Sequence, residues 1–368
     1  MIPLFKVAMS DRALDRVSDV LTSRQIGHGP RAAEFEHAVG ARIGTPHVAA
    51  VNSATSGLQL ALRLTPELPG DEVLTTALTF EATNWAILAA GLRPRWVDVD
   101  PTTLNMDLAD LERKITPATR AIVVVHWAGY PVDLARLREV VDRAEAAHGV
   151  RPAVVEDCAH AWGASFRGVP VGNHGNTAVF SFHALKFLTC GEGGLVVLPD
   201  AETARRARLL RWFGIDRTAD RASADYDVAE WGYKIHLNEL GAAIGLANLD
   251  DVDGLVARHR DHAAHYDEVL DGVAGLRLTE RADDREPSWW VYPVLVEDRP
   301  AFLRKMTGAG VAVSAIVRRN DLHSCVREYA AHLPRLDEVH ERVAHIPVGW
   351  WLSEEDLDRV VSAIRSGW

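Results

Sequence analysis

Short apolar runs alternate with helical patterns along the first two thirds of the chain. The runs are rich in β-branched and other apolar residues, and they lie at His47–Val51, Ala121–Val125, Ala153–Glu156, Ala178–Phe182 and Leu195–Leu198. Helical segments such as Leu108–Lys114 and Leu134–His148 lie between several of these runs. Such an alternation is typical of an α/β domain with a large, mostly parallel sheet.

The pattern changes at Asn238. Apolar residues recur near helical spacing from there to Leu270, which predicts one long linker helix. The rest of the chain predicts a smaller α/β domain, with strands at Ser288–Leu295 and Val311–Ile316 and an amphipathic last helix at Ser353–Ser366. We therefore place a large domain at residues 1–245 and the linker helix with a small C-terminal domain at residues 246–368.

The composition narrows the classes of partner. A chain of 368 residues has room for about two domains. The formal net charge of −11 argues against a protein that binds nucleic acid through its phosphate backbone. Any small anionic ligand must therefore be held by a local cluster of donors.

Cysteine usage and hydropathy point to a cytoplasmic protein. The three cysteines, Cys158, Cys190 and Cys325, have no CxxC spacing, so neither a disulfide framework nor a metal site is expected. Residues Met1–Lys6 lack the apolar core of a signal peptide. The longest apolar stretch, Ala121–Val132, is too short to span a membrane.

An acidic pair, Glu156-Asp157, ends one of the predicted strands. In open α/β sheets the carboxyl ends of strands face the ligand crevice. An acid at that place can keep a heterocyclic nitrogen protonated, as the pyridinium of pyridoxal phosphate requires. The alternative is an acid that caps the next helix, and the motif alone leaves both open.

A lysine follows another strand, within the segment Ser181–Gly194. Lys186 stands among apolar residues and before the glycine-rich turn that ends in Gly193-Gly194. A lysine under apolar cover has a lowered pKa, so its amine can act as a nucleophile. The alternative is a solvated loop lysine.

Small polar residues follow the strand that ends at Val51. Asn52-Ser53-Ala54-Thr55-Ser56 lead into a helix predicted at Gly57–Arg63. Free N–H groups and the positive end of the helix dipole suit a phosphate at such a place, although an ordinary N-cap has the same sequence. The chain has no GxGxxG after a strand, no GxxxxGK[ST] and no GxSxG.

Taken in this order, the motifs resemble the DegT family of fold-type-I, pyridoxal-phosphate-dependent sugar aminotransferases. The resemblance covers most of the chain. Besides the three motifs above, it rests on Ile26-Gly27-His28-Gly29-Pro30, Thr79-Phe80-Glu81-Ala82-Thr83, Val97-Asp98-Val99-Asp100, His126-Trp127-Ala128-Gly129, Gly232-Tyr233-Lys234 and Ala242-Ala243-Ile244-Gly245.

The resemblance implies roles for individual residues. Lys186 would bind pyridoxal 5′-phosphate as a Schiff base, and Asp157 would pair with the pyridinium nitrogen. Phe80 would stack on the ring of the cofactor. The phosphate would be held by Ser53, Ala54, Thr55 and Ser181.

Some positions depart from the family pattern. His160 stands where the family usually has Gln beside the ring hydroxyl, and Phe187 replaces the usual Asn after the lysine. Lys234 stands where many members have an Asn that reaches the phosphate bound in the partner subunit. A branch of the family replaces the lysine with histidine and dehydrates sugars, but Lys186 argues against that branch.

The activity that the resemblance implies is transamination in two stages. In the first stage an amino donor, L-glutamate or L-glutamine, would transfer its amino group to the cofactor and convert it to pyridoxamine 5′-phosphate. In the second stage pyridoxamine 5′-phosphate would aminate a keto-sugar, which in many members is carried on a nucleotide. This predicts a role in amino-sugar or antibiotic biosynthesis. The alternatives are amination of a keto-cyclitol or another unactivated ketone, a cysteine desulfurase, and a non-catalytic regulator with the same fold.

The segment 315–323 occupies the place of a family substrate loop. Arg318, Arg319 and His323 are its candidate substrate contacts, and a solvated basic turn is the alternative. Because adjacent side chains in an extended segment point to opposite faces, at most one of the two arginines can face the site directly. The resemblance also implies a homodimer in which the neighbouring subunit completes each site.

Overall fold

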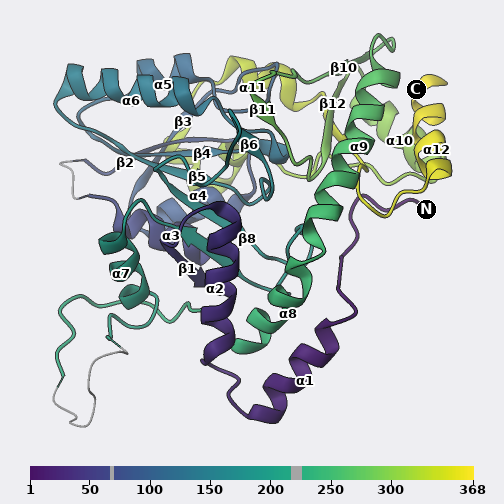
Figure 1. Ribbon diagram of the computed structural model, residues 1–368. Helices are drawn as coiled ribbons and strands as arrows, with labels where there is room; N and C mark the ends of the chain where they lie inside the picture. Colours follow the sequence, from purple (N-terminus) through teal and green to yellow (C-terminus); the bar gives the residue numbers. More distant parts are fainter. Residues whose placement is uncertain (67–69, 217–225) are drawn as a thin grey trace.

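The computed structural model describes residues 1–66, 70–216 and 226–368 (Figure 1). Its main sheet has the strand order β1-β9-β8-β5-β4-β2-β3. The pairs from β8 to β3 are parallel, whereas β9 is antiparallel to β1 and β8. These strands are β1 (Val48–Val51), β2 (Glu72–Thr76), β3 (Arg93–Val97), β4 (Thr119–Val125), β5 (Ala153–Asp157), β8 (Thr177–Ser181) and β9 (Gly194–Val197). The predicted α/β fold with a mostly parallel sheet is therefore confirmed.

Helices cover both faces of this sheet, which explains why the central parts of its strands are mostly apolar. Successive strand residues alternate between the faces: Val123 packs with α3 and α4, and its neighbours Ile122 and Val124 pack with α5 and α6. The helices on the first face are α3 (Ala54–Leu64), α4 (Glu81–Ala89) and α7 (Ala201–Leu210). Those on the second are α5 (Leu108–Lys114), α6 (Leu134–His148), α2 (Pro30–Ile43) and α8 (Glu239–Leu249).

The predicted linker helix is two helices. Helix α8 ends at Leu249, and α9 (Val252–Leu270) begins after the exposed pair Asp250-Asp251. The α8 helix is buried on most sides, because α1 (Ala13–Ser23) and α2 pack against it. Figure 1 shows α9 leaving the main sheet toward the C-terminus. The boundary predicted after residue 245 falls inside α8.

Residues 271–368, which we call the C-terminal unit, contain a three-stranded sheet in the order β10-β12-β13. Its elements are β10 (Leu276–Leu278), β12 (Tyr292–Val296), α10 (Arg299–Gly308), α11 (Pro334–His340), β13 (Val343–Ile346) and α12 (Glu354–Arg365). The N-terminus belongs beside this unit, since Ile2 pairs with Val311. Figure 1 shows both ends of the chain near α12.

Two strands predicted for the C-terminal unit need correction. The first begins only at Tyr292, because Trp289 has a positive φ of 54° that breaks the extended backbone. Residues 311–316 form only isolated bridges, and Ile316 has a φ of 65°. The predicted last helix agrees with α12, which Ser353 caps.

The remaining elements are short. They are β6 (Ser165–Phe166), β7 (Val169–Pro170) and β11 (Arg285–Glu286), and the 3-10 helices η1 (Trp127–Gly129), η2 (Asn320–Leu322) and η3 (Ser324–Tyr329). Among the described residues, no helix combines the length and apolar character needed to cross a membrane.

Candidate active site

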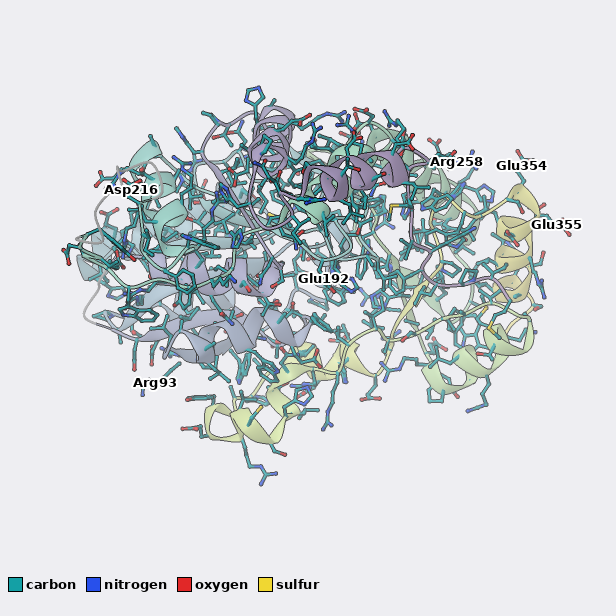
Figure 2. The ribbon with its side chains drawn as sticks, turned by 90° about the horizontal axis from the view of Figure 1, so that it is seen from below. Arg93, Glu192, Asp216, Arg258, Glu354 and Glu355 are labelled. Atoms are coloured by element: carbon teal, nitrogen blue, oxygen red, sulfur yellow. The ribbon has the colours of Figure 1, made fainter. Side chains whose placement is uncertain are left out.

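A pocket of about 310 Å³ lies at the carboxyl ends of the parallel strands, where β1, β5 and β8 end. Ligands bind at this edge in open α/β sheets. Glu192, which lines the pocket, lies near the middle of the view in Figure 2, whereas Glu354 and Glu355 of α12 lie at one end. The lining includes the predicted residues Ser53, Ala54, Thr55, Phe80, Asp157, His160, Ser181 and Lys186.

Lys186 follows β8 in a tight turn, in which its N–H donates to the carbonyl of His183 at 2.9 Å. Its side chain is half-buried, and Nζ lies 3.5 Å from the ring centroid of Trp290. Burial lowers the pKa of Lys186 to about 7, although the charge of Asp157 opposes this shift. A large share of the amine is therefore neutral near pH 7 and able to attack a carbonyl.

Asp157 is the last residue of β5 and is buried. Its Oδ2 accepts from the Thr83 hydroxyl at 2.7 Å, and its Oδ1 accepts from the Ala159 N–H at 3.0 Å. Burial raises the pKa of this carboxyl, and these two donors together with Lys186 oppose the rise. The Thr83 hydroxyl is in turn 2.9 Å from that of Thr79. These hydrogen bonds fix the orientation of the Asp157 carboxyl group.

The predicted phosphate loop begins helix α3. Ser53 is the N-cap, and its hydroxyl accepts from the Ser56 N–H at 3.1 Å. Strand β9 passes so close that a Cβ on Gly194 would lie 2.7 Å from the Ala54 nitrogen and the Ser53 carbonyl carbon. Ser181 ends β8 on the same side of the pocket. A helix N-terminus with two hydroxyl side chains beside it suits a phosphate.

His160 lines the pocket and packs against two tryptophan rings. Its ring stacks on Trp290 at 4.1 Å between centroids and meets the edge of Trp127 at 5.3 Å. Burial lowers the pKa of His160 well below its ordinary value, so the imidazole is neutral. Its buried Nδ1 has no hydrogen-bond partner in the described part of the protein. An unsatisfied buried nitrogen costs free energy, and a ligand hydroxyl would satisfy it.

These residues fit pyridoxal phosphate group by group. Asp157 would pair with the pyridinium nitrogen, the start of α3 would hold the phosphate, and the Nδ1 of His160, which has no hydrogen-bond partner among the described residues, would bind the ring hydroxyl. Phe80 is 59% exposed at the pocket, with its ring available to cover a flat ligand. The fold and the Lys186–Asp157 pair define a fold-type-I pyridoxal-phosphate enzyme.

A second acid and a histidine support the site from behind. His126 Nδ1 accepts from the Val132 N–H at 3.0 Å, so Nε2 carries the proton and donates to Glu156 at 3.0 Å. Asn176 donates to the other oxygen of Glu156 at 2.7 Å. Cys158 lies close enough to complete a group of metal-ligand atoms, but both nitrogens of His126 are already used in hydrogen bonds.

Several residues predicted for the site lie outside the pocket lining. Lys234 is exposed, and its Nζ lies 5.8 Å from the ring centroid of Trp212. Arg318 is exposed, and its guanidinium donates to the Leu322 carbonyl at 3.3 Å. His323 is paired with Glu81, with 3.4 Å between Nε2 and Oε1.

Arg319 is the clearest departure from the predicted substrate contacts. Its guanidinium is buried and donates twice to Asp321 at 2.8 Å and once to Asp337. Two carboxylates occupy the donors that a substrate phosphate would need. Instead, the segment presents the apolar side chains Ile316 and Val317 to the pocket.

Four of the lining residues that complete the pocket are absent from the predicted set: Phe5, Thr83, Trp290 and Val317. Thr83 does stand in the Thr79–Thr83 motif that carries the family resemblance, so that motif held a usable signal. Phe5 reaches the pocket from the N-terminal segment and stacks on Trp290 at 4.8 Å. No local pattern marks either aromatic residue, because their contact joins segments 285 positions apart.

Comparison with known proteins agrees with this site. The chain matches the model of the DegT/DnrJ/EryC1/StrS aminotransferase family over residues 8–365. It is similar to the structure of AtS13 from Actinomadura melliaura, with 63% identity, a TM-score of 0.99, and coverage of 100% of this chain and 99% of that one. The structure of sugar aminotransferase CalS13 from Micromonospora echinospora shares 62% identity, with a TM-score of 0.98 and complete coverage of both chains.

A more distant structure is the PMP form of the putative sugar aminotransferase Spr1654 from Streptococcus pneumoniae. It shares 28% identity, with a TM-score of 0.92 and coverage of 100% of this chain and 98% of that one. The chain belongs to the DegT/DnrJ/EryC1/StrS aminotransferase family. It is a pyridoxal-phosphate-dependent aminotransferase, as the sequence predicts.

Proposed function

We propose that this enzyme transfers an amino group from L-glutamate or L-glutamine to a keto-sugar, in amino-sugar or antibiotic biosynthesis in the cytoplasm. The observation that carries the proposal is the pairing of Lys186 with the buried Asp157 in one pocket. The sugar acceptor is supported by the 62% identity with CalS13, which is a sugar aminotransferase.

Lys186 and Asp157 have separate roles in the proposed reaction. Pyridoxal phosphate, when bound, supplies an electron sink for the pair of electrons left at the donor α-carbon. Asp157, whose carboxyl accepts hydrogen bonds from Thr83 and the Ala159 N–H, would pair with the ring nitrogen and keep it protonated. Lys186 would take the proton from the donor α-carbon as general base and give it up again as general acid, because its pKa of about 7 suits both roles.

We propose that the acceptor is nucleotide-linked and that Arg318 contacts its diphosphate. Val317 lines the pocket, and the exposed Arg318 is the next residue in the chain. In the structure its guanidinium donates to the Leu322 carbonyl, so the proposed contact requires this side chain to turn toward the substrate. We assign Arg319 a structural role because its guanidinium already forms ion pairs with Asp321 and Asp337. Guanidinium groups suit the two-point recognition of phosphate oxygens.

A keto-cyclitol remains the second candidate, on one observation. Among the described residues that line the pocket there is no arginine, which favours an uncharged ring at the pocket itself. The two candidates differ in the second half-reaction. Enzyme converted to its amino form should aminate a keto-sugar with a higher kcat/KM when the sugar carries its nucleotide. If the nucleotide does not raise kcat/KM, the keto-cyclitol hypothesis replaces the hypothesis of a nucleotide-linked keto-sugar.

We propose a homodimer with two shared sites. Lys234 lies outside the lining of its own pocket and is exposed, so its expected role toward a phosphate requires the pocket of another copy. The interface of such an obligate dimer should exceed about 2,000 Å². Mixing Lys186→Ala protein with Lys234→Ala protein should restore part of the activity, since one site in a mixed dimer then has neither change. A monomer at working concentration, or no recovery after subunit exchange, contradicts the shared site.

A further inference from the structure

Two asparagines that are distant in the sequence meet in the interior beside the pocket. Asn84 belongs to α4, Asn320 begins η2, and the Asn84 Nδ2 donates to the Asn320 Oδ1 at 2.7 Å. Both side chains are completely buried. A buried amide is costly unless its hydrogen bonds are made, so a pair of them at this depth has a specific place in the fold.

Asn320 uses every polar group that its side chain offers. One Nδ2 hydrogen bond goes to the Thr79 carbonyl at 2.9 Å and another to the Arg318 carbonyl at 3.2 Å. Its backbone N–H donates to the Ala77 carbonyl at 2.8 Å. The residue therefore fastens the segment after Val317 to residues 77–80, which we call the 77–80 loop.

Asn84 holds Asn320 from the other side. Its Nδ2 also donates to the Thr76 carbonyl at 3.0 Å, and its Oδ1 accepts from the Thr75 hydroxyl at 2.8 Å. An asparagine side chain has two donors and one acceptor oxygen, so both amide hydrogens and the oxygen of Asn84 are used. A fully satisfied network of this kind specifies one arrangement of its backbone segments.

The network joins two neighbouring segments of the pocket lining. One contains Ile316 and Val317, which we call the acceptor wall, and both line the pocket. The other, the 77–80 loop, supplies Thr79 and Phe80 to the same lining. Ile316 has a φ of 65°, which is costly for a β-branched residue and persists only where the surroundings hold it.

We propose that Asn320, held by Asn84, is the residue that positions the acceptor wall against the 77–80 loop. It is a positioning residue, because it lies behind the lining and acts through Ile316 and Val317. The inference rests on the proposed function in one respect, namely that the second half-reaction takes a keto-sugar. The acceptor wall belongs to the C-terminal unit, whereas most residues predicted to hold the cofactor lie at the ends of main-sheet strands. We therefore expect a change at Asn320 to weaken binding of the acceptor and not of the cofactor.

The test is Asn320→Asp, which keeps the shape but turns an oxygen toward the carbonyls of Thr79 and Arg318. The matched control is Asn105→Asp. Asn105 is also buried, and its amide donates to the Tyr130 carbonyl at 3.0 Å, so the control loses the same kind of bond elsewhere. Asn320→Ser, which adds no charge, serves if Asn320→Asp does not fold.

Each folded variant is measured in three ways. The KM of the nucleotide-linked keto-sugar in the second half-reaction should rise about tenfold or more in the Asn320 variants and less than about threefold in Asn105→Asp. The rate of the glutamate half-reaction should fall less than about threefold. The Kd of pyridoxal phosphate for the cofactor-free protein should change less than about threefold.

Two results overturn the inference. An unchanged acceptor KM in the Asn320 variants means that the pair does not position the wall. Equal losses in both half-reactions and in cofactor affinity mean that Asn320 supports the whole site and not the wall. Failure of the proposed function is distinguishable, because the wild-type enzyme would then accept amino groups from glutamate but aminate no keto-sugar.

Discussion

The most direct test of the site is Asp157→Asn. The substitution keeps the size of the side chain and removes its charge. Because Oδ1 accepts from the Ala159 N–H at 3.0 Å, a purely structural role in the turn after β5 is the alternative, and the described residues that follow form no helix that Asp157 could cap. Asparagine can accept the same hydrogen bond, so the free energy of unfolding of the cofactor-free protein should change little.

The expected loss of rate follows from the burial. Asp157 is only 4% exposed, and its charged partner would be the pyridinium nitrogen of the cofactor. Removing one member of a buried ion pair costs about 3–5 kcal/mol. At about 1.4 kcal/mol for each factor of ten, the rate should fall at least about 100-fold. Thr83→Val removes one of the two donors to Asp157 and should cost less, about tenfold, since a hydrogen bond to a charged group contributes about 1.5–3 kcal/mol.

The assay is the single-turnover glutamate half-reaction, followed by the change of the cofactor absorption band. Cofactor content is measured in parallel, so that loss of binding is separated from loss of chemistry. A fall of less than about threefold in Asp157→Asn, with full cofactor content, would show that Asp157 has only a structural role in the turn after β5 and that the electron-sink assignment is wrong. Thr83→Val with a larger loss than Asp157→Asn would contradict the order of effects.

Three further predictions concern pH, the phosphate loop and the arginine pair. Capture of pyridoxal phosphate by the cofactor-free protein, followed by stopped-flow absorbance, should speed up as pH rises through about 7, where Lys186 loses its proton, and then level off; a rise that continues toward 10 contradicts the lowered pKa. Gly194→Ala should weaken pyridoxal phosphate binding about tenfold in a titration, because its Cβ would collide with the phosphate loop. Gly254→Ala, where a Cβ meets nothing within 4 Å, is its control and should bind normally. Arg319→Ala should lower the free energy of unfolding by about 3–5 kcal/mol. Arg318→Ala should leave it within about 0.5 kcal/mol and raise the KM of a nucleotide-sugar several-fold; the reverse pattern contradicts the assignment.

Local patterns in the sequence predicted five strands of the main sheet to within a residue or two at each end. Strands β2 and β3, which carry Glu72, Arg93 and Arg95, were not predicted because charged residues interrupt their apolar pattern. Helices α5 and α6 begin and end at the predicted residues, because their apolar spacing and aspartate caps are local signals. Lys186 and Asp157 were predicted from the strands that precede them and from the family resemblance. Parallel strands bring their carboxyl ends to one edge, so residues placed there by sequence meet in space.

The C-terminal unit shows where local patterns fail. Residues 311–316 are apolar enough for a strand, but the positive φ at Ile316 turns the backbone toward the pocket. The long helix predicted through Leu270 is interrupted at Asp250-Asp251, where α8 leaves the core and the chain turns outward. In both cases packing against distant segments overrides the local preference.

The sequence by itself determined the fold class and, through the family resemblance, the cofactor. It also predicted Lys186 and Asp157 as the residues that act on the cofactor, because one follows a strand and the other ends one. Only the tertiary structure decided the rest of the pocket. It placed Phe5 and Trp290 together, committed Arg319 to Asp321, and joined Asn84 to Asn320 across 236 positions. These contacts depend on which buried polar and aromatic groups satisfy one another, and that pairing is set by three-dimensional packing and not by spacing along the chain.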